Sequence, residues 1–247
     1  MVGATAALLS PRRWAALAAA VAVVVAWDAG AGVLPTLSLW PDVLVISLVV
    51  LPATLTIPLL GLPLSPIRVA LPLAAGSALL AAVFYATGLG ALFNVSKLLA
   101  VMFLGYVFMQ VFEALSWVVL IALVIPWVDA WSVWRGPTGY VVSNKPGLLE
   151  HISIGFRSSG AEGYASLGPP DILFFALFLA AAHRFGLRVG WTWVSMVGLL
   201  ALTILLTTEW DVAGLPALPA IAIGFLLPNA DLLWRAWRER GLEASSD

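Results

Sequence analysis

The chain has 247 residues, of which 62% are hydrophobic and only 10% are charged. A soluble domain is about half apolar and a quarter charged, so this composition is typical of a polytopic membrane protein. The net charge of −1 gives no indication of nucleic-acid binding, and the lack of cysteine excludes disulfides, thiol catalysis and thiolate metal sites.

The first apolar run, from Trp14 to Ala26, follows Arg12 and Arg13 in the manner of a signal peptide. No clear small-residue cleavage site follows it and many apolar runs come later, so we interpret it as the first membrane span. A helix needs about 20 apolar residues to cross the hydrocarbon core. On this criterion we expect eight spans, at 14–33, 42–62, 68–90, 95–112, 115–134, 170–187, 189–208 and 214–234.

The span count depends on the region around Glu113. As one straight helix, residues 95–134 would be about 60 Å long, which is too long for a single crossing. We therefore expect a tight turn at 113–116. Eight spans place both termini on one side of the membrane, with eight of the twelve basic residues, and the positive-inside rule makes this side cytoplasmic. These residues are Arg12, Arg13, Arg68, Arg184, Arg188, Arg235, Arg238 and Arg240.

We divide the chain into an N-terminal membrane scaffold of about four spans (1–113), a membrane core (114–236) and a polar C-terminal tail (237–247). The one long loop, 135–168, is expected outside. Residues 140–142 and 152–156 in it have strand-like character, and residues 144–147 are turn-like, so the loop is either an ordinary exposed connection or a small β-element over the membrane face.

The acidic residues differ in their predicted positions. Most, including Asp42, are expected in loops, at span ends or in the tail, where solvent or the interface surrounds them. Asp28 lies near the outer end of the first span, where we expect it to pair within the bundle. The two histidines, His151 and His183, are far apart in sequence and form no ligand cluster, so we predict no metal and no cofactor.

Asp129 and Asp171 lie close to the two ends of the long loop, each just inside a span. Counting inward at about 1.5 Å per residue places both carboxylates within roughly 10 Å of the same membrane face. Two close carboxylates share one proton, so one member can activate water while the other polarises a peptide carbonyl. Pro126, which precedes Asp129 by three residues, either kinks the helix and admits water or only bends the bundle.

Three segments resemble the presenilin and signal peptide peptidase family of intramembrane aspartyl proteases. "VDAWSVWRGP" around Asp129 is similar to the first catalytic segment, "LGPPDILFF" around Asp171 to the GxGD segment, and "GLPALPAI" to the PAL segment. The three occur in the family's order and cover about residues 115–234. The chain thus looks like a prokaryotic presenilin-like homologue, although the family typically has nine spans.

The resemblance implies a hydrolase that cleaves transmembrane segments of membrane proteins or signal peptides within the bilayer, in a multi-pass protein of the prokaryotic cell membrane. It makes Asp129 and Asp171 the catalytic pair. It also implies that Pro216, Ala217 and Leu218, together with Gly168 and Pro170, shape the active site. Family members pair the unwound substrate as an extended strand, a role that suits the β-like pieces of the long loop.

Two positions depart from the family pattern. Val128 stands where the family usually has tyrosine, and Pro170 replaces the second glycine of GxGD. Glycine permits unusual dihedral angles, whereas proline fixes φ and removes the N–H group. Pro170 therefore favours one alternative, a catalytically impaired member that binds membrane helices without cutting them. The other alternative is a proton-coupled transporter, because acids within spans often mark ion pathways.

Overall fold

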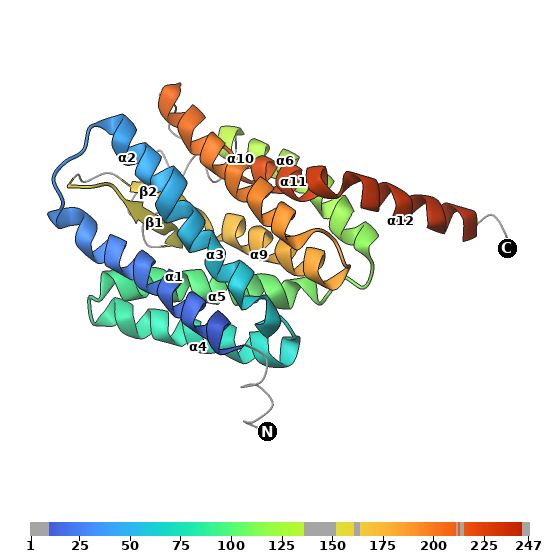
Figure 1. Cartoon of the computed structure of the whole chain (residues 1–247), viewed down its shortest axis with the longest axis horizontal. Helices are drawn as coiled ribbons and strands as arrows, with labels where there is room; N and C mark the ends of the chain where they lie inside the picture. Colours follow the sequence, from blue (N-terminus) through green and yellow to red (C-terminus); the bar gives the residue numbers. More distant parts are fainter. Residues whose placement is uncertain (1–9, 136–151, 161–163, 211, 213–214, 244–247) are drawn as a thin grey trace.

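The computed structural model describes residues 10–135, 152–160, 164–210, 212 and 215–243, which form a helical bundle with one small β-hairpin (Figure 1). In this part of the chain, six helical segments are long and apolar enough to cross a membrane. The all-α polytopic architecture predicted from the sequence is therefore confirmed. The six segments are Pro11–Val33, Leu39–Leu64, Ile67–Ala86, Gly90–Met109, Leu115–Val133 and Val189–Glu209.

The N-terminal scaffold contains the four expected helical segments. They are α1 (Pro11–Gly30), the combined rod of α2 (Leu39–Val45), a π-helical turn (Ile46–Val50) and α3 (Leu51–Gly61), then α4 (Ile67–Ala86) and α5 (Gly90–Met109). A tight turn joins α4 to α5, and there Gly88 adopts a φ of 72°, a left-handed conformation that favours glycine. The two helices consequently pack side by side along their lengths.

The predicted break near Glu113 is present. Helix α5 ends at Met109 and α6 (Leu115–Arg135) begins six residues later, so residues 95–134 form two helices rather than one. This confirms the feature on which the span count depended.

Helix α9 (Pro169–Arg184) lies at the centre of the bundle, in contact with α3, α5, α6, α10 (Val189–Glu209) and α11 (Leu218–Leu226). Its residues from Phe175 to Ala182 are buried on every side, which explains why this helix is apolar all round. At Gly105 of α5, an added Cβ would lie 2.5 Å from the carbonyl oxygen of Leu173. Glycine therefore permits the close approach of α5 to α9.

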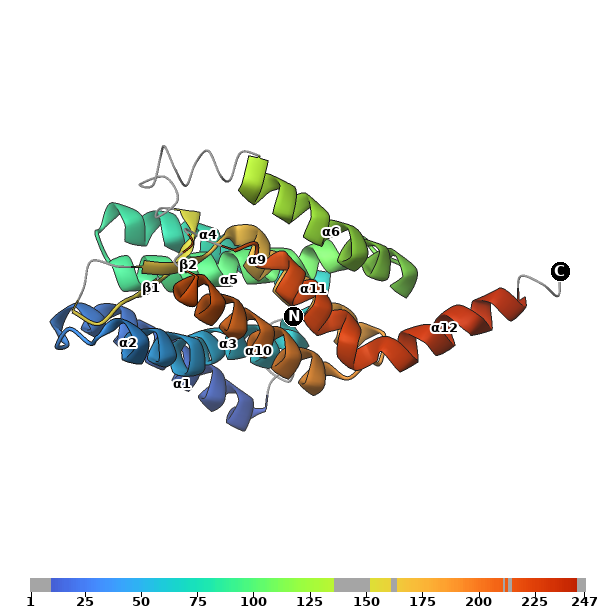
Figure 2. The ribbon, with the colours of Figure 1, turned by 90° about the horizontal axis from the view of Figure 1, so that it is seen from above.

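The prediction of one continuous last span, 214–234, is wrong. Helix α11 has nine residues and is followed by a 3-10 turn (Leu227–Asn229) and then by α12 (Ala230–Glu243). Pro228 lies in the turn, and proline removes one α-helical hydrogen bond and favours a kink or break there. The chain consequently changes direction, and α12 extends beyond the end of the bundle (Figures 1 and 2). The predicted polar tail from 237 is thus helical as far as Glu243.

The β-hairpin lies at the opposite end of the bundle from α12 (Figure 1). Strand β1 (Ile154–Arg157) pairs antiparallel with β2 (Tyr164–Leu167), and Gly155 stands opposite Ser166. The small β-element expected in the long loop is therefore confirmed at its second strand-like segment. The other segment, 140–142, and the turn at 144–147 lie outside the described residues, and β2 had no counterpart in the prediction.

Polar groups from two helices hold the outer edge of β1. The Asn94 side chain of α5 donates to the Gly155 carbonyl at 2.8 Å and accepts from the Gly155 N–H at 3.1 Å. The Trp27 indole of α1 donates to the Arg157 carbonyl at 3.0 Å. Asn94 thus supplies the same donor and acceptor pair that a neighbouring strand would offer.

Two acids of the N-terminal half, Asp28 and Asp42, also bind this region. Asp28 is buried and lies 3.7 Å from the Arg157 guanidinium, so the pairing predicted for it is present. Asp42 is also buried, and its carboxylate accepts from the backbone N–H and the hydroxyl of Ser159 at 2.8 and 2.7 Å. The expectation that Asp42 is solvated or interfacial was therefore wrong, because the segment after β1 folds back over it.

Candidate functional site

Asp129 projects from α6 towards the start of α11. The side chain is half-buried, and its Oδ2 atom accepts a hydrogen bond from the Leu218 backbone N–H at 3.0 Å. Leu218 is the first residue of α11, so its N–H has no acceptor within the helix. A carboxylate at this position satisfies that donor and complements the helix dipole. The segment resembling PAL is therefore in direct contact with the first candidate aspartate.

Asp171 occupies the first turn of α9, and it is half-buried as well. Its Oδ2 atom accepts from the Gly168 backbone N–H at 2.8 Å, so the carboxylate caps the helix from which it projects. The helix start and the candidate chemistry thus involve the same oxygen atom.

The backbone around Pro170 is ordinary. Gly168 is extended, with φ of −68° and ψ of 157°, and Pro169 and Pro170 follow at the first two helical positions. Proline is well suited to the first turn of a helix, because the missing N–H would have no helical acceptor there. The unusual dihedral angles that a second glycine would permit are therefore not used in this structure.

The two carboxylates approach each other where α6 meets α9. They are close enough for the Asp129 charge to act on Asp171, and α6 and α9 are in contact. One oxygen of each carboxylate is engaged by a backbone N–H, which fixes the side-chain orientation. Two neighbouring carboxylates are the kind of pair that can share one proton.

The other residues of the segment resembling PAL lie beside this pair. Pro216 and Ala217 are half-buried, whereas Leu218 is buried. Ala217 is the residue before α11, and its carbonyl accepts from the Ile221 N–H at 3.2 Å. Gly168 and Pro170 therefore lie at the start of α9, which carries Asp171, and Pro216, Ala217 and Leu218 lie at the start of α11, which binds Asp129 of α6.

Helix α11 is fixed against both of its neighbours. The Phe225 ring stacks on Phe178 of α9, with centroids 4.8 Å apart and 12° between the ring planes. A Cβ added at Gly224 would lie 2.6 Å from the Cα atom of Met196 in α10, so glycine permits the two backbones to approach closely. The depth of Leu218, and with it the contact to Asp129, follows from these two packings.

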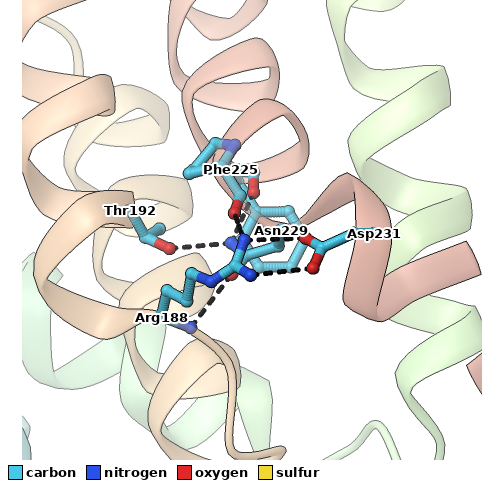
Figure 3. Close-up of polar contacts among 6 residues, drawn as sticks. Arg188, Thr192, Phe225, Asn229 and Asp231 are labelled. Atoms are coloured by element: carbon cyan, nitrogen blue, oxygen red, sulfur yellow. Dashed lines mark hydrogen bonds and ion pairs between the residues drawn. The ribbon is translucent and has the colours of Figure 1, made fainter. Parts of the chain in front are cut away.

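A polar cluster fixes the far end of α11 (Figure 3). The fully buried Asn229 amide donates to the Thr192 hydroxyl and to the Phe225 carbonyl, both at 2.8 Å. Its oxygen accepts from the Arg188 N–H at 3.0 Å. The Arg188 guanidinium, in turn, makes two hydrogen bonds of 2.7 Å to the Asp231 carboxylate. We call these residues the α10–α12 latch, because they join the start of α10 to the start of α12.

Neither the latch residues nor the strand-like use of Asn94 was predicted from the sequence. A buried asparagine in an apolar run is the only signal that could have indicated either role, since such a group must find hydrogen-bond partners. In the part of the chain that the structure describes, no group of three or more histidine, aspartate or glutamate side chains is arranged to hold a metal ion. His183 is exposed, and His151 lies outside the described residues.

Comparison of the chain with models of protein families, with curated proteins and with solved structures gives no significant match.

Proposed function

We propose that the protein is an intramembrane aspartyl protease of the presenilin and signal peptide peptidase type. The observation that carries the proposal is the approach of Asp129 to Asp171, with the Leu218 N–H bound to the first of them. Acids within membrane helices are costly and are normally retained for function. Two of them at a helix–helix contact, each oriented by a backbone donor, support the assignment of an aspartyl dyad.

The reaction requires no group beyond the two carboxylates and water. The ionised member takes a proton from water as the water oxygen attacks the peptide carbonyl, and the protonated member donates to the carbonyl oxygen. Collapse of the tetrahedral intermediate breaks the C–N bond, and a proton passes to the leaving nitrogen. The products are a carboxylate and an amine. Because the pair acts as a unit, neither role is assigned to one residue.

The hairpin supports the handling of an extended substrate. Since Gly155 directs its N–H and carbonyl towards Asn94, the opposite residue Ser166 directs its own groups away from β1. Ser166 is exposed, and no described residue forms a hydrogen bond to its outward groups. An unwound membrane segment that paired with Ser166 would lie along β2, five residues before Asp171. We propose transmembrane segments of membrane proteins or signal peptides as the substrates.

The distribution of charge supports cytoplasmic termini in a prokaryotic cell membrane. The starts of α1 and α4, the α9–α10 connection and α12 carry arginine at one end of the bundle, opposite the hairpin. The positive-inside rule assigns this end to the cytoplasm and the hairpin to the outside.

The decisive experiment is cleavage of a membrane-embedded substrate by the full chain in vesicles. We expect Asp129→Ala and Asp171→Ala each to lower the cleavage rate at least about a thousandfold, because neither carboxylate can act alone. Glu113→Gln, which removes an exposed acid at the α5–α6 turn, is the matched control and should cleave normally. Either aspartate variant with wild-type activity would show that the dyad assignment is wrong.

A second function is favoured by one observation. The Asp171 carboxylate caps its own helix, because one of its oxygens accepts the Gly168 N–H. This role is structural and requires no catalysis. A family member that binds membrane helices without cleaving them would keep this cap and the hairpin. Pro170→Gly separates the two functions. If proline restrains a working site, cleavage rises in this variant; if the chain only binds helices, neither form cleaves and both retain a substrate peptide.

A further inference from the structure

One edge of the hairpin is bonded to the helical bundle at every second residue. Four side chains of α1, α2 and α5 bind the backbone of alternate residues, which are Ser153, Gly155, Arg157 and Ser159. In the same order, the four side chains are those of Lys97, Asn94, Trp27 and Asp42. Alternate residues of a strand direct their N–H and carbonyl groups towards the same edge. The four side chains, which we call the β1 ladder, therefore take the place of a neighbouring strand.

The segment bound by the β1 ladder has one register against the helices. A shift of one residue would turn Ile154 and Phe156, which are 1% and 2% exposed, away from the core. A shift of two residues would displace Gly160 from a position where an added Cβ would lie 2.5 Å from the Leu34 carbonyl oxygen. No residue with a side chain would fit there in its place, so the β1 ladder holds the strand in a single position.

Strand β2 transmits this position to Asp171. Gly155 of β1 stands opposite Ser166 of β2. Two residues after Ser166, the Gly168 N–H donates to the Asp171 carboxylate at 2.8 Å, and α9 begins at Pro169. No loop between β2 and α9 can absorb a movement of the strand. The outward backbone groups of Ser166 therefore lie at a fixed position relative to the Asp171 carboxylate.

The β1 ladder includes a charged group that is costly inside a membrane span. Lys97 is half-buried in α5, and a lysine within a span normally extends to the interface or meets a compensating group. Here the ammonium group donates to the Ser153 carbonyl, and the buried Asp28 carboxylate is close enough for its charge to act on it. Asp28 also lies 3.7 Å from the Arg157 guanidinium. Charge compensation thus couples α1 and α5 to the same strand.

We propose that the β1 ladder determines which peptide bond of the substrate is cleaved, with Asn94, Lys97 and Trp27 as positioning residues. The inference rests on the proposed protease function and on the pairing of an extended substrate with Ser166. Consecutive residues of a strand are about 3.3 Å apart, so the residue that pairs with Ser166 sets the peptide bond that reaches the two carboxylates. Movement of the hairpin by one such step would present a neighbouring bond.

The test measures the position of cleavage as well as its rate. The full chain is reconstituted in vesicles with a synthetic signal peptide, and the products are identified by mass spectrometry. We expect the wild type to cut mainly one peptide bond. Asn94→Leu removes two hydrogen bonds, so the ratio of products cut at neighbouring bonds to the main product should rise roughly eightfold. Trp27→Phe removes one hydrogen bond and should raise this ratio roughly threefold.

Matched variants separate positioning from stability. Gln110→Leu removes amide hydrogen bonds at the other end of α5, and Trp193→Phe removes an indole hydrogen bond of α10. Both should leave the product ratio unchanged, even where they slow cleavage. Lys97→Met should raise the ratio, whereas Lys97→Arg, which keeps a donor for the Ser153 carbonyl, should retain the wild-type ratio.

The outcomes distinguish this inference from the proposed function. An inactive wild type would refute the proposed function and this inference with it. A wild type that cleaves, with ladder variants that cut the same bond in the same ratio, would refute this inference alone. An equal change of the ratio in Gln110→Leu and Asn94→Leu would overturn it as well. So would loss of cleavage in every ladder variant with helical circular dichroism retained, because the ladder would then be required for activity and not for position.

Discussion

The α10–α12 latch combines the hydrogen bonds of the buried Asn229 side chain with the exposed ion pair between Arg188 and Asp231. We predict that the Asn229 bonds contribute more to the stability of the protein. Asn229 is fully buried, whereas the Arg188 and Asp231 side chains are each more than 40% exposed. The perturbation we choose is Asn229→Leu, because leucine is similar in volume and removes hydrogen bonds without opening a large cavity. The two short bonds between Arg188 and Asp231 remain.

The magnitude follows from the bonds that are lost. Asn229 makes two bonds to the start of α10, one to the Thr192 hydroxyl and one to the Arg188 N–H. Hydrogen bonds between membrane helices contribute about 0.6 kcal/mol on average and about 1.7 kcal/mol at most, so two of them contribute about 1.2 to 3.4 kcal/mol. We expect a loss of about 2 kcal/mol in the free energy of unfolding, since the buried Thr192 hydroxyl loses its partner.

The assay is unfolding of the full chain in mixed micelles with increasing sodium dodecyl sulfate, followed by the loss of helical circular dichroism. Asp231→Asn is the comparison, and we expect a much smaller change because solvent screens an exposed ion pair. Thr192→Val combined with Asn229→Leu gives the coupling energy of that single contact. If Asp231→Asn destabilises the protein as much as Asn229→Leu does, the argument from burial is refuted.

Two further predictions concern close approaches between elements. Gly224→Ala should lower the free energy of unfolding in the same assay, because the new Cβ would lie 2.6 Å from the Met196 backbone. Gly198→Ala is the control and should have no such effect, because the space around Gly198 is open. Equal effects of the two variants would contradict the close approach. Asn94→Leu should release β1 by removing both bonds to Gly155, so limited proteolysis within 152–160 should accelerate several-fold, and unchanged digestion would mean that other contacts hold the strand.

The parts of the fold that depend on apolar length were predictable from the sequence. The 40 residues of 95–134 lack a strong turn signal but are too long for one crossing, so a break near Glu113 followed from bilayer thickness. The broken last span was not foreseen, although Pro228 signalled it. Proline is tolerated in membrane helices when neighbouring groups satisfy the freed backbone, and Arg188 does so by donating to the Pro228 carbonyl at 2.7 Å. That partner is 40 residues away in sequence.

The candidate site was predictable in its residues but not in its hydrogen bonds. Asp129 and Asp171 were identified from their depth in the membrane, which can be obtained by counting residues along the chain. The Leu218 and Gly168 N–H donors depend on which helix starts meet, and no periodicity encodes this. Asp42 was misplaced for a similar reason, because its burial arises from Ser159 in a segment 117 residues later.

The Asn94 contact blocks one of the two edges of the hairpin. Side chains occupy the outward groups of Gly155 and the carbonyl of Arg157, so β1 is blocked for a further strand, whereas no described residue bonds the outward groups of Ser166 in β2. Two copies of the hairpin that met through β2 would complete a four-stranded sheet, with a blocked β1 at each outer edge. Edge-to-edge growth, which unprotected strands permit without limit, would end at that pair. Asn94 and Trp27 would thus limit strand addition to one edge of the hairpin.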